Sequence, residues 1–114
     1  MHTRKLEQSE WKPYSERISK ALSGKRAEVE VVSLDLGHQI QAEWLPIYGV
    51  TYDPKDKLFE VALEGLDHLI PAPQEVYALE GPEGLASLEI VDAEGRRQIV
   101  RLKEPLALPP PEPA

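Results

Sequence analysis

The chain has 114 residues, of which 41% are hydrophobic and 6% aromatic, and it contains no cysteine. This length suits one domain, and the lack of cysteine excludes disulfide bonds, thiolate zinc sites and thiol catalysis. A net charge of −7 disfavours nucleic acids and anionic lipids as partners, and no apolar run reaches membrane-spanning length. We therefore expect a soluble cytoplasmic protein with no membrane partner.

Residues 9–23 carry the one clear helical pattern of the chain. Apolar residues recur there at spacings of three and four, which predicts a single buried stripe: Trp11, Tyr14, Ile18 and Leu22. Ser9 is suited to cap the amino end of this helix, and Gly24 is suited to end it. An apolar stripe needs a partner, so we expect the helix to pack on the open face of a sheet.

From residue 26 onward the apolar pattern changes to a period of two, which predicts short antiparallel strands. The strands predicted in the first half of the chain are residues 27–36, 39–45, 50–52 and 58–63. The apolar face switches between Val31 and Val32, which indicates either a bulge or a strand that moves from one environment to another. Pro46 and Gly49 interrupt a long apolar run and predict a bend in a central strand.

The second half of the chain continues this pattern. Leu66–Ile70 fits either a short helical turn or a strand, and residues 75–79 form a weak strand. Leu85–Val91 and Arg97–Leu102 predict a hairpin. Residues 105–114 hold five of the eleven prolines and predict an extended, flexible tail. The expected organisation is thus a single domain over residues 1–104 and a Pro-rich tail over residues 105–114.

One amino-terminal helix followed by several antiparallel strands predicts an α+β fold. Two architectures share this order of elements. In one, the helix packs on a curved antiparallel β-sheet, and in the other the strands close into a small barrel of the Sm or SH3 type. The order of elements does not separate them, and similar topologies carry unrelated functions.

A polar cluster of Glu64, Asp67 and His68 suggests chemistry, because a carboxylate beside an imidazole can act in acid–base catalysis or bind a metal. Adjacent strand residues point to opposite faces, so Asp67 and His68 share a site only within a turn. A two-histidine metal site would also require His38 and His68 to converge. A small hydrolase or metal-assisted enzyme is therefore one alternative. We assign no catalytic, cofactor-binding or metal residue, and we expect no cofactor.

Four cations, Arg96, Arg97, Arg101 and Lys103, form the strongest basic cluster. They lack neighbouring aromatic stacking platforms, and the protein as a whole is acidic, so they are a weak signal for nucleic-acid binding. Pairing with Glu89 and other acids across strands is favoured. An Sm-like nucleic-acid binder is the third functional alternative.

The apolar surplus at Trp44, Leu45, Ile47 and Tyr48 exceeds what strand alternation explains. A barrel would bury both faces of this strand, whereas exposed apolar groups beside a bend would make a docking or dimer surface. The leading hypothesis is a non-catalytic binding or assembly module that uses this surface. Its partner would be another protein or a second copy of the chain.

Several strings of residues are distinctive as sequence motifs: Leu34–Gln39, Glu43–Pro46, Gly49–Asp56, Leu63–Ile70, Ser87–Asp92 and Arg97–Val100. Together they resemble a small bacterial family catalogued only as a domain of unknown function. The resemblance covers the chain nearly up to Leu108 and implies a stand-alone bacterial protein. It implies no activity, substrate or catalytic residue.

Overall fold

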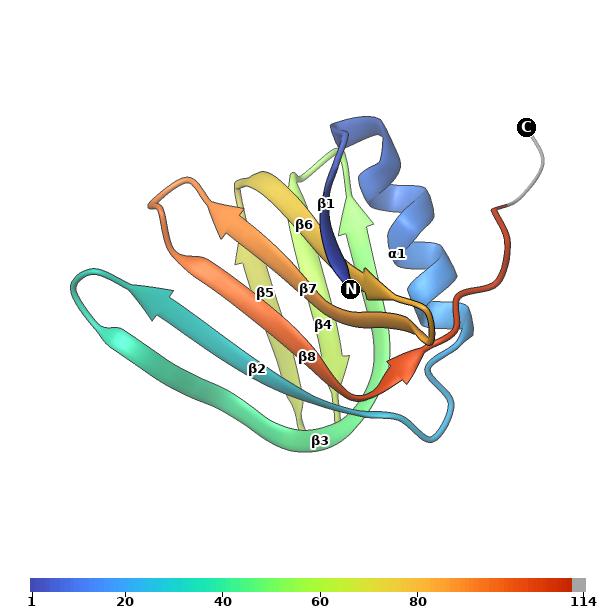
Figure 1. The fold of residues 1–114 in the computed structure, drawn as a ribbon. Helices are drawn as coiled ribbons and strands as arrows, with labels where there is room; N and C mark the ends of the chain where they lie inside the picture. Colours follow the sequence, from blue (N-terminus) through green and yellow to red (C-terminus); the bar gives the residue numbers. More distant parts are fainter. Residues whose placement is uncertain (112–114) are drawn as a thin grey trace.

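The alternating segments form one eight-stranded antiparallel sheet with a short helix, in a computed structural model that describes residues 1–111 (Figure 1). The elements are β1 (His2–Leu6), η1 (Gln8–Glu10), α1 (Trp11–Lys20), β2 (Arg26–Ser33), β3 (Gly37–Asp53), β4 (Leu58–Leu63), β5 (Leu66–Pro71), β6 (Pro73–Gly81), β7 (Gly84–Asp92) and β8 (Arg97–Leu106). The strand order is β1-β6-β7-β8-β2-β3-β4-β5. β1 and β5 are the two edges, so the sheet is open. The predicted α+β class is confirmed, and the small-barrel alternative is not.

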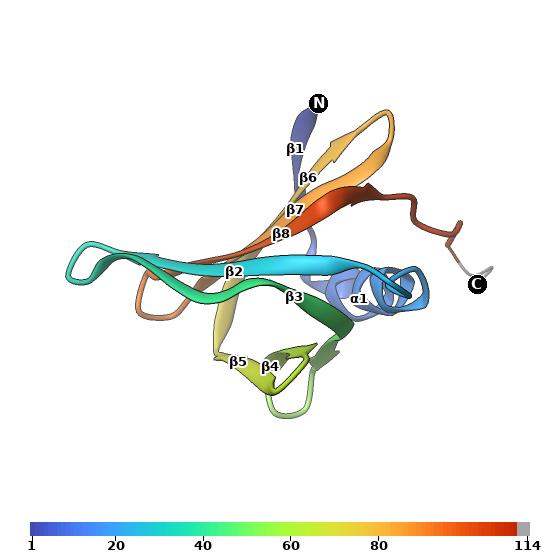
Figure 2. The ribbon, with the colours of Figure 1, turned by 90° about the horizontal axis from the view of Figure 1, so that it is seen from below.

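β3 belongs to two parts of the sheet, and a bend separates them. Its first part, through Pro46, pairs with β2, and its second part, from Ile47, pairs with β4. Seen from below, the β4–β5 hairpin turns away from the plane of β2 and β3 (Figure 2). Register shifts near Trp44 and at Tyr48 flank this bend. Because bulges bend a strand and increase its twist, they account for the bend predicted from Pro46 and Gly49.

α1 forms from the predicted amphipathic pattern and lies against the second part of β3. Its buried stripe holds Trp11, Tyr14 and Ile18, with Leu22 just beyond the helix. The Ser19 hydroxyl accepts a hydrogen bond from the Val50 N–H at 2.9 Å and donates one to the Val50 carbonyl at 2.7 Å. α1 therefore satisfies backbone groups of β3 that a neighbouring strand would otherwise pair.

The start of the helix differs from the prediction. Ser9 lies inside η1 and caps nothing there. A capping box built from two glutamates serves instead, in which the Glu7 N–H donates to the Glu10 carboxylate at 2.8 Å. This arrangement satisfies backbone donors at the start of the helical segment.

The core fills the space between α1 and the inner face of the sheet. An aromatic cluster lies at one end, where the ring centroids of Trp11 and Tyr52 are 5.3 Å apart and those of Tyr52 and Phe59 are 4.7 Å apart. Branched aliphatic residues supply most of the rest, as the scarcity of aromatics requires. Among the helices of residues 1–111, none has the length and apolar character needed to cross a membrane.

Three strand boundaries depart from the sequence pattern. Val31 and Val32 pair regularly with both neighbouring strands, so no bulge lies between them; β2 ends at Ser33, and Leu34 and Leu36 are exposed in the hairpin turn. Residues 39–45 and 50–52 belong to one strand, because β3 continues through Pro46. Residues 66–70, for which a helical turn was the other interpretation, form strand β5.

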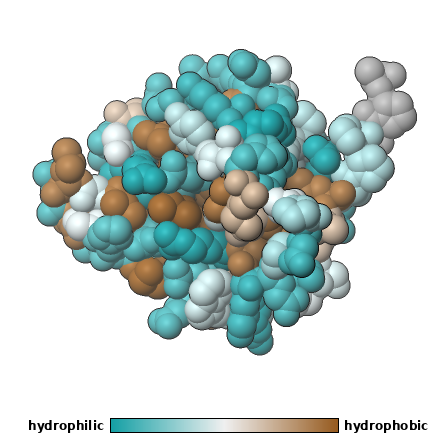
Figure 3. Space-filling view, in the orientation of Figure 1, coloured by the Kyte–Doolittle hydropathy of each residue, from teal (hydrophilic) through white to brown (hydrophobic). Residues whose placement is uncertain are grey.

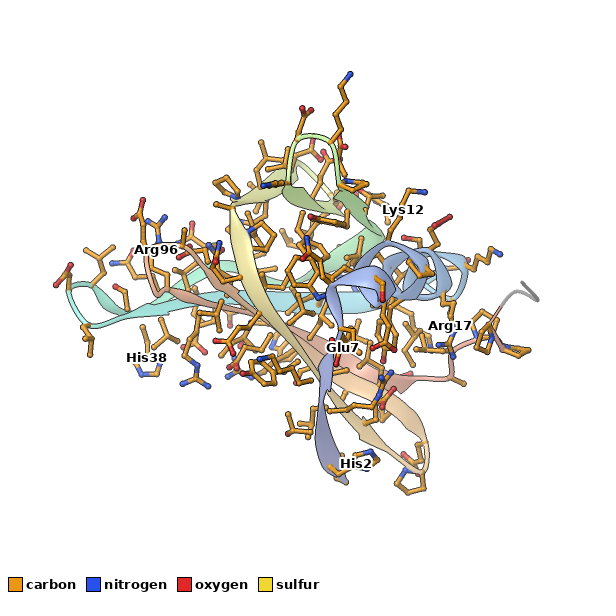
Figure 4. The ribbon with its side chains drawn as sticks, turned by 90° about the horizontal axis from the view of Figure 1, so that it is seen from above. His2, Glu7, Lys12, Arg17, His38 and Arg96 are labelled. Atoms are coloured by element: carbon orange, nitrogen blue, oxygen red, sulfur yellow. The ribbon has the colours of Figure 1, made fainter. Side chains whose placement is uncertain are left out.

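Residues 2–6 and 105–109, near the two ends of the chain, are more ordered than the sequence indicates. β1 pairs with β6 and buries Leu6, although no strand was predicted there. β8 extends to Leu106, which is buried, so it enters the segment predicted as a flexible tail. Beyond it, Arg17 Nε donates to the Pro109 carbonyl at 2.9 Å (Figure 4). The last three residues of the predicted tail, 112–114, lie outside the described residues.

Candidate functional site

The predicted polar cluster does not assemble into a single site. Glu64 is exposed in the turn between β4 and β5. Asp67 is exposed on β5, whereas the adjacent His68 is half-buried and faces the other way. Among residues 1–111, no three His, Asp or Glu side chains gather closely enough to hold a metal ion.

His38 and His68 lie on opposite faces of the sheet. His38 Nδ1 is 2.9 Å from a carboxylate oxygen of Glu30, and His68 Nε2 is 2.6 Å from Gln98 Oε1. Glu30 and Val31 are neighbours on β2, and Val31 pairs with Gln98 on β8. Paired residues share a face, so Glu30 and Gln98 lie on opposite faces of the sheet. Neighbouring strand residues point to opposite faces, so the two imidazoles do not share a site. In Figure 4, His38 lies on the β2–β3 hairpin, well away from the terminal His2.

His68 instead belongs to a buried hydrogen-bond chain at the end of β7. Asp92 is 3% exposed, and its carboxylate accepts hydrogen bonds from Gln98 Nε2 at 3.0 Å and from Arg96 Nε at 3.1 Å. Because the Gln98 amide nitrogen donates to Asp92, its oxygen accepts from His68, which places the His68 proton on Nε2. Burial raises the pKa of Asp92, but these hydrogen bonds outweigh burial and hold that pKa below its usual value. The chain fixes the β7–β8 turn and orients His68.

The predicted basic cluster is largely neutralised by acids across the strands. Arg97 Nε donates to Glu89 at 3.0 Å, and Arg101 pairs with Glu30 at 2.8 Å. Hydrogen bonding from Arg101 keeps the pKa of Glu30 below its usual value. The cross-strand pairing expected of these arginines is confirmed. On this face, apolar groups appear as islands between hydrophilic side chains (Figure 3). Little unpaired positive charge is left there for a phosphate backbone.

The four residues of the predicted apolar surface have different surroundings. Ile47 is 2% exposed and belongs to the core, and Leu45 packs against that core. Tyr48 is 60% exposed, and Trp44 is half-buried. Of the predicted surface, Tyr48 is therefore exposed and Trp44 is partly exposed, and we call these two residues the bend aromatics.

Bulges explain why the bend aromatics leave the core. Between the pairs Ile47–Leu63 and Gly49–Ala62, Tyr48 is the extra residue on β3. An extra residue has no partner on the neighbouring strand, and its side chain is re-aimed. Trp44 lies in another bulge, with its backbone in the left-handed region at φ 52°. A bulky residue adopts this conformation only at an energetic cost.

A hollow of about 450 Å³ lies beside Tyr48, between the carboxyl end of α1, the loop to β2 and the bend of β3. Its lining combines apolar groups with cations: Leu22, Pro46 and Tyr48, together with Lys20, Lys25 and Arg26. We call it the basic hollow. A smaller hollow of about 230 Å³ shares Lys25 and Arg26 and adds Lys103 and Glu104. The Arg26 guanidinium also donates to the Trp44 carbonyl at 3.0 Å, which links this loop to the first bulge.

The sequence reasoning missed this hollow because its cations come from separate segments. Lys25 and Arg26 reach the bend of β3 through backbone pairing between distant segments: Arg26 pairs with Pro46, and the Ile47 N–H donates to the Lys25 carbonyl at 3.1 Å. Lys103 joins them because β8 is the other neighbour of β2. The sequence did offer one indication of a basic site, because two adjacent cations, Lys25 and Arg26, follow the end of the predicted helix.

Comparison with known proteins gives a family without a known activity. A model described as "Family of unknown function (DUF5335)" matches residues 2–111. An "Uncharacterized protein" from Aquifex aeolicus is 38% identical over 110 residues, which cover 96% of this chain and 99% of that protein. No solved structure matches significantly.

Proposed function

Because the chain belongs to the DUF5335 family of unknown function, its relatives supply no activity, and we propose from its own surface that it is a non-catalytic protein-binding module. The membership confirms the resemblance noted in the sequence. The proposed contact surface is the bend of β3, with the bend aromatics and the basic hollow between α1 and β2. Cytoplasmic location stays a prediction.

The observation that carries the proposal is the left-handed backbone of Trp44. Glycine would adopt this conformation without strain, whereas an L-residue pays about 1–2 kcal/mol. Strained backbone with a large aromatic residue at a bulge is typical of a functional surface, where the side chain's position matters more than stability.

Tyr48 independently supports the bend of β3 as a contact region. It is 60% exposed and lines the hollow together with Leu22 and Pro46. Tyrosine and tryptophan are enriched at the centres of protein interfaces because they bury much area with few rotatable bonds. An open hollow of this size fits side chains of an extended protein segment.

The proposal is tested with the immobilised chain and a phage-displayed library of random peptides. We expect peptides to be enriched that bind the wild type and Leu69→Ala equally. Leu69 is a suitable control because it is 51% exposed on β5, away from the bend. Binding of these peptides to Tyr48→Ala should be weaker by about tenfold or more, as for an interface hot spot.

Two results would contradict the proposal: no enriched peptide, or peptides that bind Tyr48→Ala as well as the wild type. Sedimentation of the chain without peptide shows whether the partner is a second copy. A dimer that Tyr48→Ala dissociates would assign the bend of β3 to self-assembly.

A further inference from the structure

We infer that the partner segment is acidic, and that its carboxylates bind Lys25, Arg26 and Lys103 while an apolar side chain packs on Tyr48. This inference rests on the proposed function and specifies the chemistry of the partner. It follows from the charge, the shape and the surroundings of the basic hollow.

Three cations with little internal pairing gather at the basic hollow. On the outer face of the sheet, Arg97 is paired with Glu89. Within residues 1–111, by contrast, neither Arg26 nor Lys103 has a carboxylate partner. Lys25 has one only at 3.8 Å, from a Glu104 side chain that is 75% exposed. These three cations can therefore accept carboxylates from another molecule with little loss of internal pairing.

The shape of the site favours an extended segment. The two hollows, of about 450 and 230 Å³, share Gly24, Lys25 and Arg26 in their linings. The first is also lined by the apolar residues Leu22, Pro46 and Tyr48, and the second by Lys103 and the exposed Glu104. An apolar residue can occupy the first while a neighbouring Asp or Glu reaches the second.

Arginine and lysine contribute differently to this recognition. The Arg26 guanidinium is held at the Trp44 carbonyl by one hydrogen bond at 3.0 Å, which leaves its other N–H groups for a ligand. A planar guanidinium suits bidentate carboxylate binding, whereas lysine acts as a point charge. Arg26 would therefore fix the position of one carboxylate, and Lys25 and Lys103 would add attraction.

The test uses two fluorescein-labelled peptides, one of alternating Glu and Leu residues and one with Gln in place of Glu, and measures fluorescence polarisation. We expect the Glu peptide to bind at least about fivefold more tightly than the Gln peptide. Lys103→Glu should weaken binding of the Glu peptide by about fivefold, because it replaces one exposed ion pair with a repulsion between like charges. The matched control is Lys55→Glu in the β3–β4 turn, which changes the net charge equally and is expected to leave the affinity within about twofold.

The outcomes separate this inference from the proposed function. Equal binding of the two peptides, both sensitive to Tyr48→Ala, would overturn the acidic partner and leave the binding module. The acidic partner would also be overturned, and the binding module kept, if neither peptide binds but library peptides without Asp or Glu bind the wild type and not Tyr48→Ala. Equal losses in Lys103→Glu and Lys55→Glu would also overturn the inference, because the effect would then come from net charge. Peptide binding of any kind that ignores Tyr48 would contradict both.

Discussion

Replacing Trp44 with alanine and with glycine tests the backbone strain at the bend of β3. Both variants lose the indole, so the packing of that ring cancels when they are compared. At φ 52° an alanine keeps the left-handed penalty of about 1–2 kcal/mol, and a glycine does not. Glycine has a larger entropic cost of about 0.5–1 kcal/mol. At mid-range, the difference between these two effects makes Trp44→Gly more stable than Trp44→Ala by about 0.75 kcal/mol.

Urea unfolding followed by circular dichroism measures this difference. The control position is Thr51, an exposed residue of the same strand that pairs with Glu60 and has no left-handed backbone. There the order should reverse, with Thr51→Ala more stable than Thr51→Gly by about 0.5–1 kcal/mol. If Trp44→Ala is as stable as Trp44→Gly or more stable, the strain at Trp44 is absent and the main support for the proposed function is lost.

Three further predictions concern stability. Gly84→Ala should destabilise the fold by about 3 kcal/mol in urea, because a Cβ there would lie 2.2 Å from the Leu106 carbonyl oxygen; an unchanged midpoint would contradict this contact. Ser19→Ala should cost about 1–3 kcal/mol, since it leaves the N–H and carbonyl of Val50 unpaired, and a loss below this range would show that water replaces the hydroxyl. The folded-state pKa of Asp92 is lowered, so its contribution is present above its unfolded pKa of about 3.9 and is lost as pH falls through the folded value. Asp92→Asn should therefore lower stability at neutral pH and flatten its decline in acid, and an unaltered pH profile would refute this.

Local patterns in the sequence predicted local structure well. The helical stripe around Tyr14 and Ile18 and the hairpin of Leu85–Val91 with Arg97–Leu102 depend on side chains close in sequence, which period and turn chemistry reveal. The ion pair of Arg97 with Glu89 was also predictable, because a hairpin places such residues side by side.

Features that depend on pairing between distant segments were not predictable. β1 is an edge strand in which only Leu6 is buried, so it shows no alternation. The hydrogen bond between His68 and Gln98 joins strands that are not neighbours in the sheet, and no local pattern carries that information. β3 continues through Pro46, with bulges in its pairing to β2 before the proline and to β4 after it. Proline is tolerated in strands at such bulges.

The candidate surface was predicted in part. The apolar surplus at residues 44–48 correctly drew attention to the bend, but alternation does not show which of Ile47 and Tyr48 faces water. The register shift on β3 decides it, because it makes Tyr48 the extra residue. The cations of the basic hollow were missed for a similar reason, since Lys103 reaches Lys25 and Arg26 only through the order of the strands.

The most direct test of the binding module is a titration of the isotope-labelled chain with the Glu and Leu peptide, followed through its backbone amide NMR signals. We expect the largest shift changes at residues 22–26, 47 and 48, together with the indole N–H of Trp44. Changes centred on the outer face near Glu89 and Arg97, or around His68, would contradict it. So would the absence of any change at peptide concentrations that saturate the polarisation signal.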